Sequence, residues 1–193
     1  MPFPEHQRKL LLDTAWQSIQ HGLATGKPLP VRAQAFEKPL GDPGASFVTL
    51  HKDGDLRGCI GSLEAYRPLI NDVAENAFSA AFRDPRFPAL QAEELEALTL
   101  DISVLSQPQA MSFESEQDLL DQIQAGTDGL ILQDKLHRGT FLPSVWESLP
   151  DRTLFLQHLK LKAGLPADHW SSEIQVWRYT TECFGSDSYR QIG

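Results

Sequence analysis

Cysteine is scarce in this chain of 193 residues, which contains only Cys59 and Cys183. Two cysteines cannot form the disulfide framework of a small secreted protein, although a single bridge between them stays possible. We therefore expect a cytoplasmic protein whose thiols stay reduced.

Long apolar runs are also missing, since none approaches the ~20 residues that span a bilayer. The first segment, "MPFPEHQRKLLLDTAW", is interrupted by Asp13 and lacks the extended apolar region of a signal peptide. We interpret it as a helix of the fold. The sequence therefore predicts no membrane partner.

Basic residues are few, with 17 Lys and Arg against 26 Asp and Glu, which gives a formal net charge of -9. Nucleic-acid-binding domains usually carry a basic stripe, and the clusters at 6–9 and 159–162 are too short to form one. A nucleic-acid-associated regulator is therefore the least favoured class of function.

Residue patterns of common cofactor sites are absent as well. The six histidines are dispersed and do not form the local pairs of a zinc site. The segment "GDPGAS" lacks the lysine and the following helix of a phosphate-binding loop. The sequence therefore predicts no metal and no cofactor.

The periodic patterns that are present alternate between helices and short strands. Apolar spacing predicts helices over 5–21, 68–82, about 115–124 and 151–163. Strands are expected near Val31 and over 46–51, 56–61, 97–105, 129–133, 138–142 and 173–180. Because the strands come in hairpins, we predict an α+β fold with mainly antiparallel sheets layered with helices.

The turn Asp53-Gly54 sets the register of the first hairpin. Counting outward from this turn, Cys59 should face Val48 and Arg57 should face Leu50. Cys59 and Arg57 then share one sheet face while His51 lies on the other, which disfavours a Cys59–His51 pair. A one-residue bulge at Gly58 would overturn this conclusion.

The motif around Cys59 is the main candidate site. Arg57 would stabilise a thiolate at Cys59 if both lie near solvent, which makes the two residues catalytic candidates. Gly58 and Gly61 would let a ligand or another backbone approach closely. The alternative is a small buried cysteine beside glycines that accommodate a packed helix, and both interpretations stay open.

A second cluster, "RDPRFP" at 83–88, follows the helix expected over 68–82. Asp84 and Arg86 are candidate ligand-binding residues because Arg binds carboxylates and phosphates bidentately. A capped turn with an internal Asp–Arg pair is the alternative. Ser62, directly after the motif, and Ser103, on the polar side of its strand, complete the ligand-binding candidates.

Ordered blocks of sequence resemble the AMMECR-one domain family over about residues 8–183. The signature Leu56-Arg57-Gly58-Cys59-Ile60-Gly61 is complete. Further matching blocks are 47–49, 84–88, 102–106, 128–130, 142–145 and 162–165.

The resemblance implies a two-lobed α+β domain with the signature in a cleft between the lobes. We place a smaller lobe at about 30–66 and a larger lobe at 1–29 plus 67–193, within a single domain spanning 1–193. The family has no established reaction. Its prokaryotic members look like one component of a three-part system, together with a Memo-type protein and a radical S-adenosylmethionine protein.

Two classes of function stay nearly equal. In the first, the protein is an enzyme of a modification pathway in which Cys59 is a nucleophile, Arg57 stabilises its thiolate and Arg86 binds an anionic substrate. No general base can be assigned from the sequence. In the second, the protein is an adaptor or regulatory module that holds a small molecule, a peptide or a partner's loop without chemistry.

Overall fold

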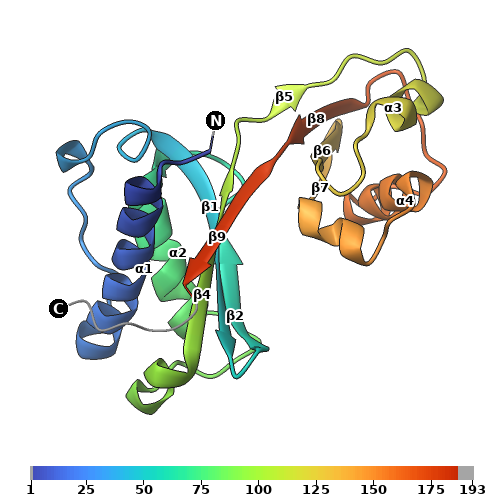
Figure 1. The fold of residues 1–193 in the computed structure, drawn as a ribbon. Helices are drawn as coiled ribbons and strands as arrows, with labels where there is room; N and C mark the ends of the chain where they lie inside the picture. Colours follow the sequence, from blue (N-terminus) through green and yellow to red (C-terminus); the bar gives the residue numbers. More distant parts are fainter. Residues whose placement is uncertain (1, 187–193) are drawn as a thin grey trace. The chain divides into compact units, whose positions relative to one another are not determined.

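The computed structural model describes residues 2–186, which form two compact units. Of the described residues, the first unit comprises 2–105 and 182–186, and the second comprises 106–181. Each unit combines helices with one antiparallel sheet, which confirms the predicted α+β class (Figure 1).

This division differs from the predicted lobes, in which 30–66 stood apart from the rest. The hairpin inside that segment pairs with a strand at 98–105 and packs against the helix at 69–82, so it belongs to the core of the first unit. Periodicity could not reveal this, because it shows that a strand has a buried face but not which element covers that face.

The sheet of the first unit has the strand order β2-β1-β4-β9, and the short strand β3 pairs with the start of β1. Its strands are β1 (Pro43–Lys52), β2 (Asp55–Gly61), β3 (Arg67–Pro68), β4 (Leu98–Leu105) and β9 (Thr181–Ser186). The predicted hairpin is confirmed, with φ of 53° at Asp53 and 89° at Gly54 in its turn. Positive φ at both central residues is what a two-residue hairpin turn of this kind requires.

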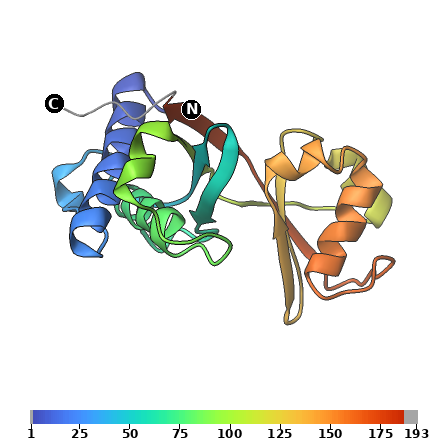
Figure 2. The same cartoon turned by 90° about the horizontal axis from the view of Figure 1, so that it is seen from below.

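Two helices, α1 (Glu5–Thr25) and α2 (Leu69–Phe82), cover one face of this sheet (Figures 1 and 2). The apolar side of α2 contributes Ile70 and Val73 to the core, and the sheet contributes Val48, Leu50 and Ile102. All five are fully buried. Burying each such side chain stabilises the fold by about 1.5–3 kcal/mol, so this face of the sheet is held against the helices.

One predicted strand is replaced by a loop and a short 3-10 helix. The strand expected near Val31 does not form, and the 3-10 helix η1 (Ala33–Ala35) follows instead. The apolar Val31 is partly buried against the first core, which accounts for its hydrophobic character without a strand. A second 3-10 helix, η2 (Ala92–Ala97), leads into β4.

The second unit has a sheet of order β5-β8-β6-β7. Its elements are β5 (Gln109–Ala110), α3 (Glu116–Gln122), β6 (Gly129–Asp134), β7 (His137–Phe141), η3 (Pro143–Glu147), α4 (Arg152–Lys162) and β8 (Gln175–Tyr179). Both predicted N-caps are present: Ser115 accepts the N–H of Asp118 at 3.1 Å, and Asp151 accepts the N–H of Leu154 at 2.9 Å. Packing in the core includes a stacked aromatic pair, Trp146 and Phe155.

The last predicted strand, at 173–180, is present as β8, and a further strand that the sequence did not predict, β9, follows it in the other sheet. The chain leaves the first unit after β4 and returns to it at β9. The two connecting segments are bonded to each other: Ser106 donates its N–H to the carbonyl of Thr180 at 2.9 Å, and Thr180 donates its N–H to Ser106 Oγ at 2.9 Å. Within residues 2–186, no helix has the length and apolar character needed to cross a membrane.

Candidate functional site

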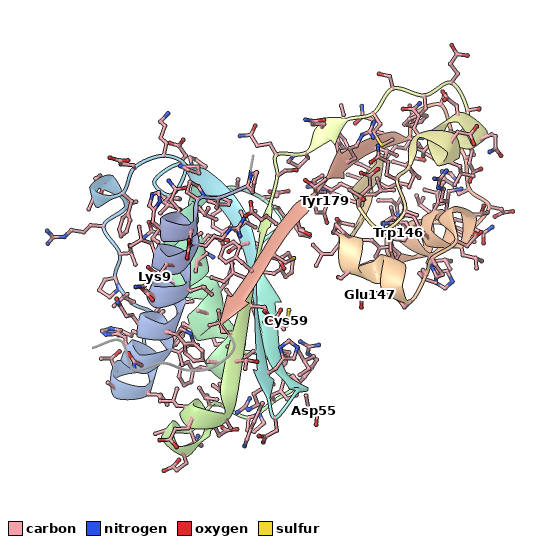
Figure 3. The ribbon with its side chains drawn as sticks, in the orientation of Figure 1. Lys9, Asp55, Cys59, Trp146, Glu147 and Tyr179 are labelled. Carbon is pink, nitrogen blue, oxygen red and sulfur yellow. The ribbon has the colours of Figure 1, made fainter. Side chains whose placement is uncertain are left out.

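The face of the first sheet opposite α1 and α2 carries the signature cysteine. We call it the Cys59 face, and it comprises Phe47, Thr49, His51, Cys59, Gly61, Asp101, Ser103 and Cys183. Along β1 and β4 these residues alternate with the buried core residues, so they point away from the helices. Figure 3 shows Cys59 projecting from β2 on the side opposite α1 and α2.

The observed register differs from the predicted one by one residue. Cys59 pairs with Thr49 and Gly58 pairs with Leu50, whereas His51 still pairs with Leu56. Arg57 is therefore the extra residue of a β-bulge, next to the Gly58 position that the sequence raised as an alternative.

The bulge reverses the predicted assignment of faces. Since Thr49 and His51 are two residues apart on β1, Cys59 and His51 lie on the same face. The prediction that separated them was wrong because turn chemistry fixes a register only as far as the first irregularity in the ladder.

Cys59 is half-buried, and its backbone and side chain contact different groups. Thr49 Oγ1 donates to the Cys59 sulfur at 3.3 Å. The N–H of Cys59 donates to Asp84 Oδ2 at 2.9 Å, and Arg86 Nη2 approaches the Cys59 carbonyl oxygen at 3.4 Å. The structure thus brings together Cys59, Asp84 and Arg86, three of the predicted site residues.

Asp84 and Arg86 form an ion pair on the outer edge of β2. Arg86 Nη2 lies 2.7 Å from Asp84 Oδ2, and its Nε lies 2.9 Å from Oδ1. The hydrogen bond from Arg86 holds the pKa of Asp84 well below its usual range, against the opposing effect of burial. Because both Asp84 and Arg86 bond to the backbone of Cys59, they complete one step of the ladder where β2 has no outer strand.

The same ion pair places a cation near the thiol. The hydrogen bond to Asp84 raises the pKa of Arg86 above its usual value, and Coulomb attraction from Cys59 adds a smaller contribution. The Arg86 side chain is 54% exposed, so its guanidinium can also meet a ligand. The internal pair and the anion-binding interpretation are therefore compatible.

Arg57 is held elsewhere. Its Nε and Nη2 donate to the two carboxylate oxygens of Glu94 at 2.9 and 3.0 Å, and Nη2 also donates to the carbonyl of Pro88 at 3.0 Å. The hydrogen bond from Arg57 lowers the pKa of Glu94 to about 2. The guanidinium therefore ties the bulge to the segment before β4, and this geometry does not favour Arg57 as the cation that serves Cys59.

The two glycines of the signature serve close packing inside the unit. A Cβ on Gly58 would lie 2.1 Å from the carbonyl oxygen of Ala80 in α2, so this position lets the helix backbone touch the strand. A Cβ on Gly61 would meet the ring of Phe47 at 2.2 Å. Of the two sequence interpretations, the helix-packing one fits Gly58.

Ser62 belongs to a different network, centred on Asp72 of α2. Asp72 is fully buried and accepts hydrogen bonds from Ser62, Arg67, Asn76 and both the backbone N–H and hydroxyl of Ser46, at 2.7 to 2.9 Å. Five donors compensate the burial of a carboxylate, so Ser62 stabilises the fold at the start of α2 and does not reach Cys59.

Ser103 lies on the Cys59 face, as its alternation predicted, and its hydroxyl is 3.1 Å from the sulfur of Cys183. Cys59 and Cys183 stand on β2 and β9, which are separated by β1 and β4. Three strand spacings amount to about 14 Å, twice the Cα separation that a disulfide bridges. Neither cysteine is in a disulfide.

The sequence missed one pair on the Cys59 face, His51 and Asp101. Asp101 is opposite Thr49 on β4, and its Oδ2 lies 3.4 Å from His51 Nδ1. Knowing the register of the β1–β4 pair would have revealed this pair, but the long segment between the strands leaves that register undetermined by sequence.

The chain is similar to a known protein family along most of its length. The AMMECR1 family model matches residues 12–184. The chain belongs to this family. Its AMMECR1 relatives include Protein MJ0810 of Methanocaldococcus jannaschii, which is 36% identical over 86% of this chain and 83% of its own length. A Methanothermobacter thermautotrophicus protein is 42% identical over 73% of this chain and 74% of its own.

A solved structure is similar throughout. The uncharacterized protein PH0010 of Pyrococcus horikoshii has a TM-score of 0.79 and 32% identity, covering 92% of this chain and 90% of its own. None of these names states an activity for the AMMECR1 relatives. The chemistry has to be argued from the site of this chain.

Two further features bear on ligands of this AMMECR1 chain. Across residues 2–186, no group of three or more His, Cys, Asp or Glu residues is arranged to hold a metal ion. The second unit contains a hollow of about 550 Å³ whose lining includes Phe113, Trp170 and Trp177, with Glu114 as its ionisable side chain. The lining offers aromatic stacking and serine hydroxyls but no cysteine, so the Cys59 face is the stronger candidate for thiol chemistry.

Proposed function

We propose that this AMMECR1 chain is a cytoplasmic component of a modification pathway and that it binds substrate on the Cys59 face. The observation that supports the proposal is a row of polar and reactive side chains on a sheet face that α1 and α2 leave uncovered. An antiparallel sheet commonly leaves one face polar and open to solvent, so the polarity of this face does not by itself point to a function. The supporting feature is the gathering of a thiol and two charged pairs: Cys59 bonds to the Asp84–Arg86 pair, and His51 and Asp101 lie on the same face.

Within this proposal, Arg86 is the residue that meets an anionic group of the substrate. Its side chain is 54% exposed and is held in place by Asp84, so little conformational freedom is lost on binding. Arg57 keeps its place in the site as the residue that shapes the bulge. The cleft expected from the family resemblance stays a prediction.

The proposed partners are a Memo-type protein and a radical S-adenosylmethionine protein. The matched substitutions Thr49→Lys, on the Cys59 face, and Thr25→Lys, at the exposed end of α1, test whether this face is used. We expect Thr49→Lys to weaken binding of at least one purified partner about tenfold, or about 1.4 kcal/mol, in titration calorimetry. Thr25→Lys should bind as the unmodified chain does.

Circular dichroism on both variants checks that the fold is retained. Failure of the unmodified chain to bind either partner would refute the partnership. Equal binding by the two lysine variants would remove the Cys59 face from it.

A further inference from the structure

We propose that Cys59 is a nucleophilic thiol whose proton is taken by His51, with Asp101 orienting the imidazole. The inference rests on the proposed function because it assigns chemistry to the same face. It supplies the general base that the sequence could not identify.

The bulge at Arg57 places Cys59 and His51 on the same face of the sheet. Cys59 is directly opposite Thr49, and His51 is the next residue of β1 on that face, so His51 is the diagonal neighbour of Cys59. Diagonal neighbours in an antiparallel pair have Cα atoms about 7–8 Å apart, a span that an imidazole side chain covers. In the structure the hydroxyl of Thr49 bonds to the Cys59 sulfur. A hydrogen bond between a catalytic base such as His51 and the thiol is often long in the absence of substrate and shortens when substrate binds.

Asp101 determines which ring nitrogen can act. His51 Nδ1 faces Asp101 Oδ2 at 3.4 Å, so a proton on Nδ1 is directed to the carboxylate. Nε2 is then the nitrogen with a lone pair, and it is the one that can accept the thiol proton.

Two polar groups adjoin Cys59 where a thiolate would form. Thr49 donates its hydroxyl hydrogen to the sulfur at 3.3 Å, and Arg86 Nη2 lies 3.4 Å from the carbonyl oxygen of Cys59. The charged groups around the pair are Asp101 on β4 and Asp84 with Arg86 after α2. Asp84 is neutralised by its ion pair with Arg86, which limits its repulsion of the thiolate.

The backbone of Cys59 narrows the reaction class. Its N–H donates to Asp84 at 2.9 Å, so the oxyanion of an acyl intermediate would need a donor other than this one. Attack on a saturated carbon needs no such donor. The substrate class of the proposal is an alkyl donor with an anionic leaving group, which Arg86 can bind.

The step is balanced without an oxidant or reductant. The thiol proton moves from Cys59 to Nε2 of His51, and a sulfur lone pair forms the S–C bond. The bond from carbon to the leaving group breaks, and the leaving group keeps the electron pair. The imidazolium then returns its proton to the leaving group or to water.

Iodoacetamide tests the inference directly, since it alkylates sulfur at a saturated carbon and releases iodide. All variants carry Cys183→Ser, so that Cys59 is the thiol that reacts. The rate of Cys59 alkylation is measured by intact mass from pH 5 to 10. The variants compared are His51→Gln, Asp101→Asn and the control His21→Gln. His51→Gln should lower the rate at pH 7 about tenfold or more, because an unassisted thiol with a pKa of ~8.5 is only a few per cent ionised there.

The pH profile separates proton transfer from changed access to the thiol. Asp101→Asn should give a smaller loss in the same direction, and His21→Gln, on α1, should give none. Above pH 9.5 the rates of the original chain and His51→Gln should converge, since an ordinary thiol is then ionised without a base. A loss that persists at high pH, or an unchanged rate in His51→Gln at every pH, overturns the inference.

The assay needs no partner protein, so it can fail or succeed independently of the binding experiment above. Binding without an effect of His51 would leave the Cys59 face as a docking surface without this chemistry. An effect of His51 without binding would keep the thiol chemistry and remove the proposed partners.

Discussion

Replacing Gly58 by alanine tests whether the signature glycine serves α2 or a ligand. An added Cβ would lie 2.1 Å from the carbonyl oxygen of Ala80, whereas ordinary contacts begin at 3.4 Å. The obstacle is helix backbone and cannot rotate away, so β2 and α2 must separate by about 1 Å. Overpacking of a well-packed core typically costs about 1–3 kcal/mol, and we expect the upper end of that range here.

The matched control is Gly26→Ala at the end of α1. Nothing lies within 4 Å of a Cβ at that position, but its φ of 70° strains any side chain, at a cost of about 1–2 kcal/mol. Denaturant unfolding, with hydrogen exchange at β1 and α2 to follow the first unit, gives both values. For a chain of this size a loss of about 3 kcal/mol lowers Tm by about 6–12 °C.

If Gly58→Ala loses no more stability than Gly26→Ala, then strand and helix are not in the close contact described, and the packing argument fails. Gly58 would then be available for the alternative role of letting a ligand approach β2.

Two further predictions concern buried charges. The Arg57 hydrogen bond lowers the pKa of Glu94 from 4.5 to about 2, so Glu94 contributes stability that is complete above about pH 4.5 and is lost as the pH falls through about 2. Glu94→Gln should reduce the change of the unfolding free energy with pH in this window, whereas the exposed control Glu93→Gln should leave that change as it is. If the unfolding free energy of Glu94→Gln varies with pH as steeply as that of the unmodified chain, the pairing is contradicted. Lys160 is fully buried and its ammonium pairs with Glu116, whose side chain is 35% exposed. Glu116→Gln should cost about 1–3 kcal/mol, because the amide oxygen keeps the hydrogen bond but not the opposite charge, whereas Lys160→Met should cost less. Thermal melts compare the last two variants, and equal losses would contradict the asymmetry.

Local signals carried the prediction of individual elements. The apolar rows of α2, the Asp53–Gly54 turn and the caps at Ser115 and Asp151 depend on residues close together in sequence, and all are present in the structure. The chemistry of a cap or a tight turn is complete within a few residues, so no distant information is needed.

Non-local features could not be predicted. The bulge at Arg57 exists because Glu94 and Pro88, more than 30 residues away, hold its guanidinium at the sheet edge. A shift of one residue then moved His51 onto the face of Cys59. The buried acceptor Asp72 was invisible for the same reason, since its donors Ser46 and Ser62 are brought to it only by the completed fold.

The second unit is a continuous insertion, because residues 106–181 lie between two neighbouring strands of one sheet, β4 and β9. Ser106 and Thr180 are bonded to each other, so the ends of this insertion meet. A segment with joined ends can be gained, lost or exchanged as a genetic cassette without disturbing its host. The aromatic hollow of the second unit can therefore be altered, by substitution or by exchange of residues 106–181, without changing the strands that carry Cys59, His51 and Asp101.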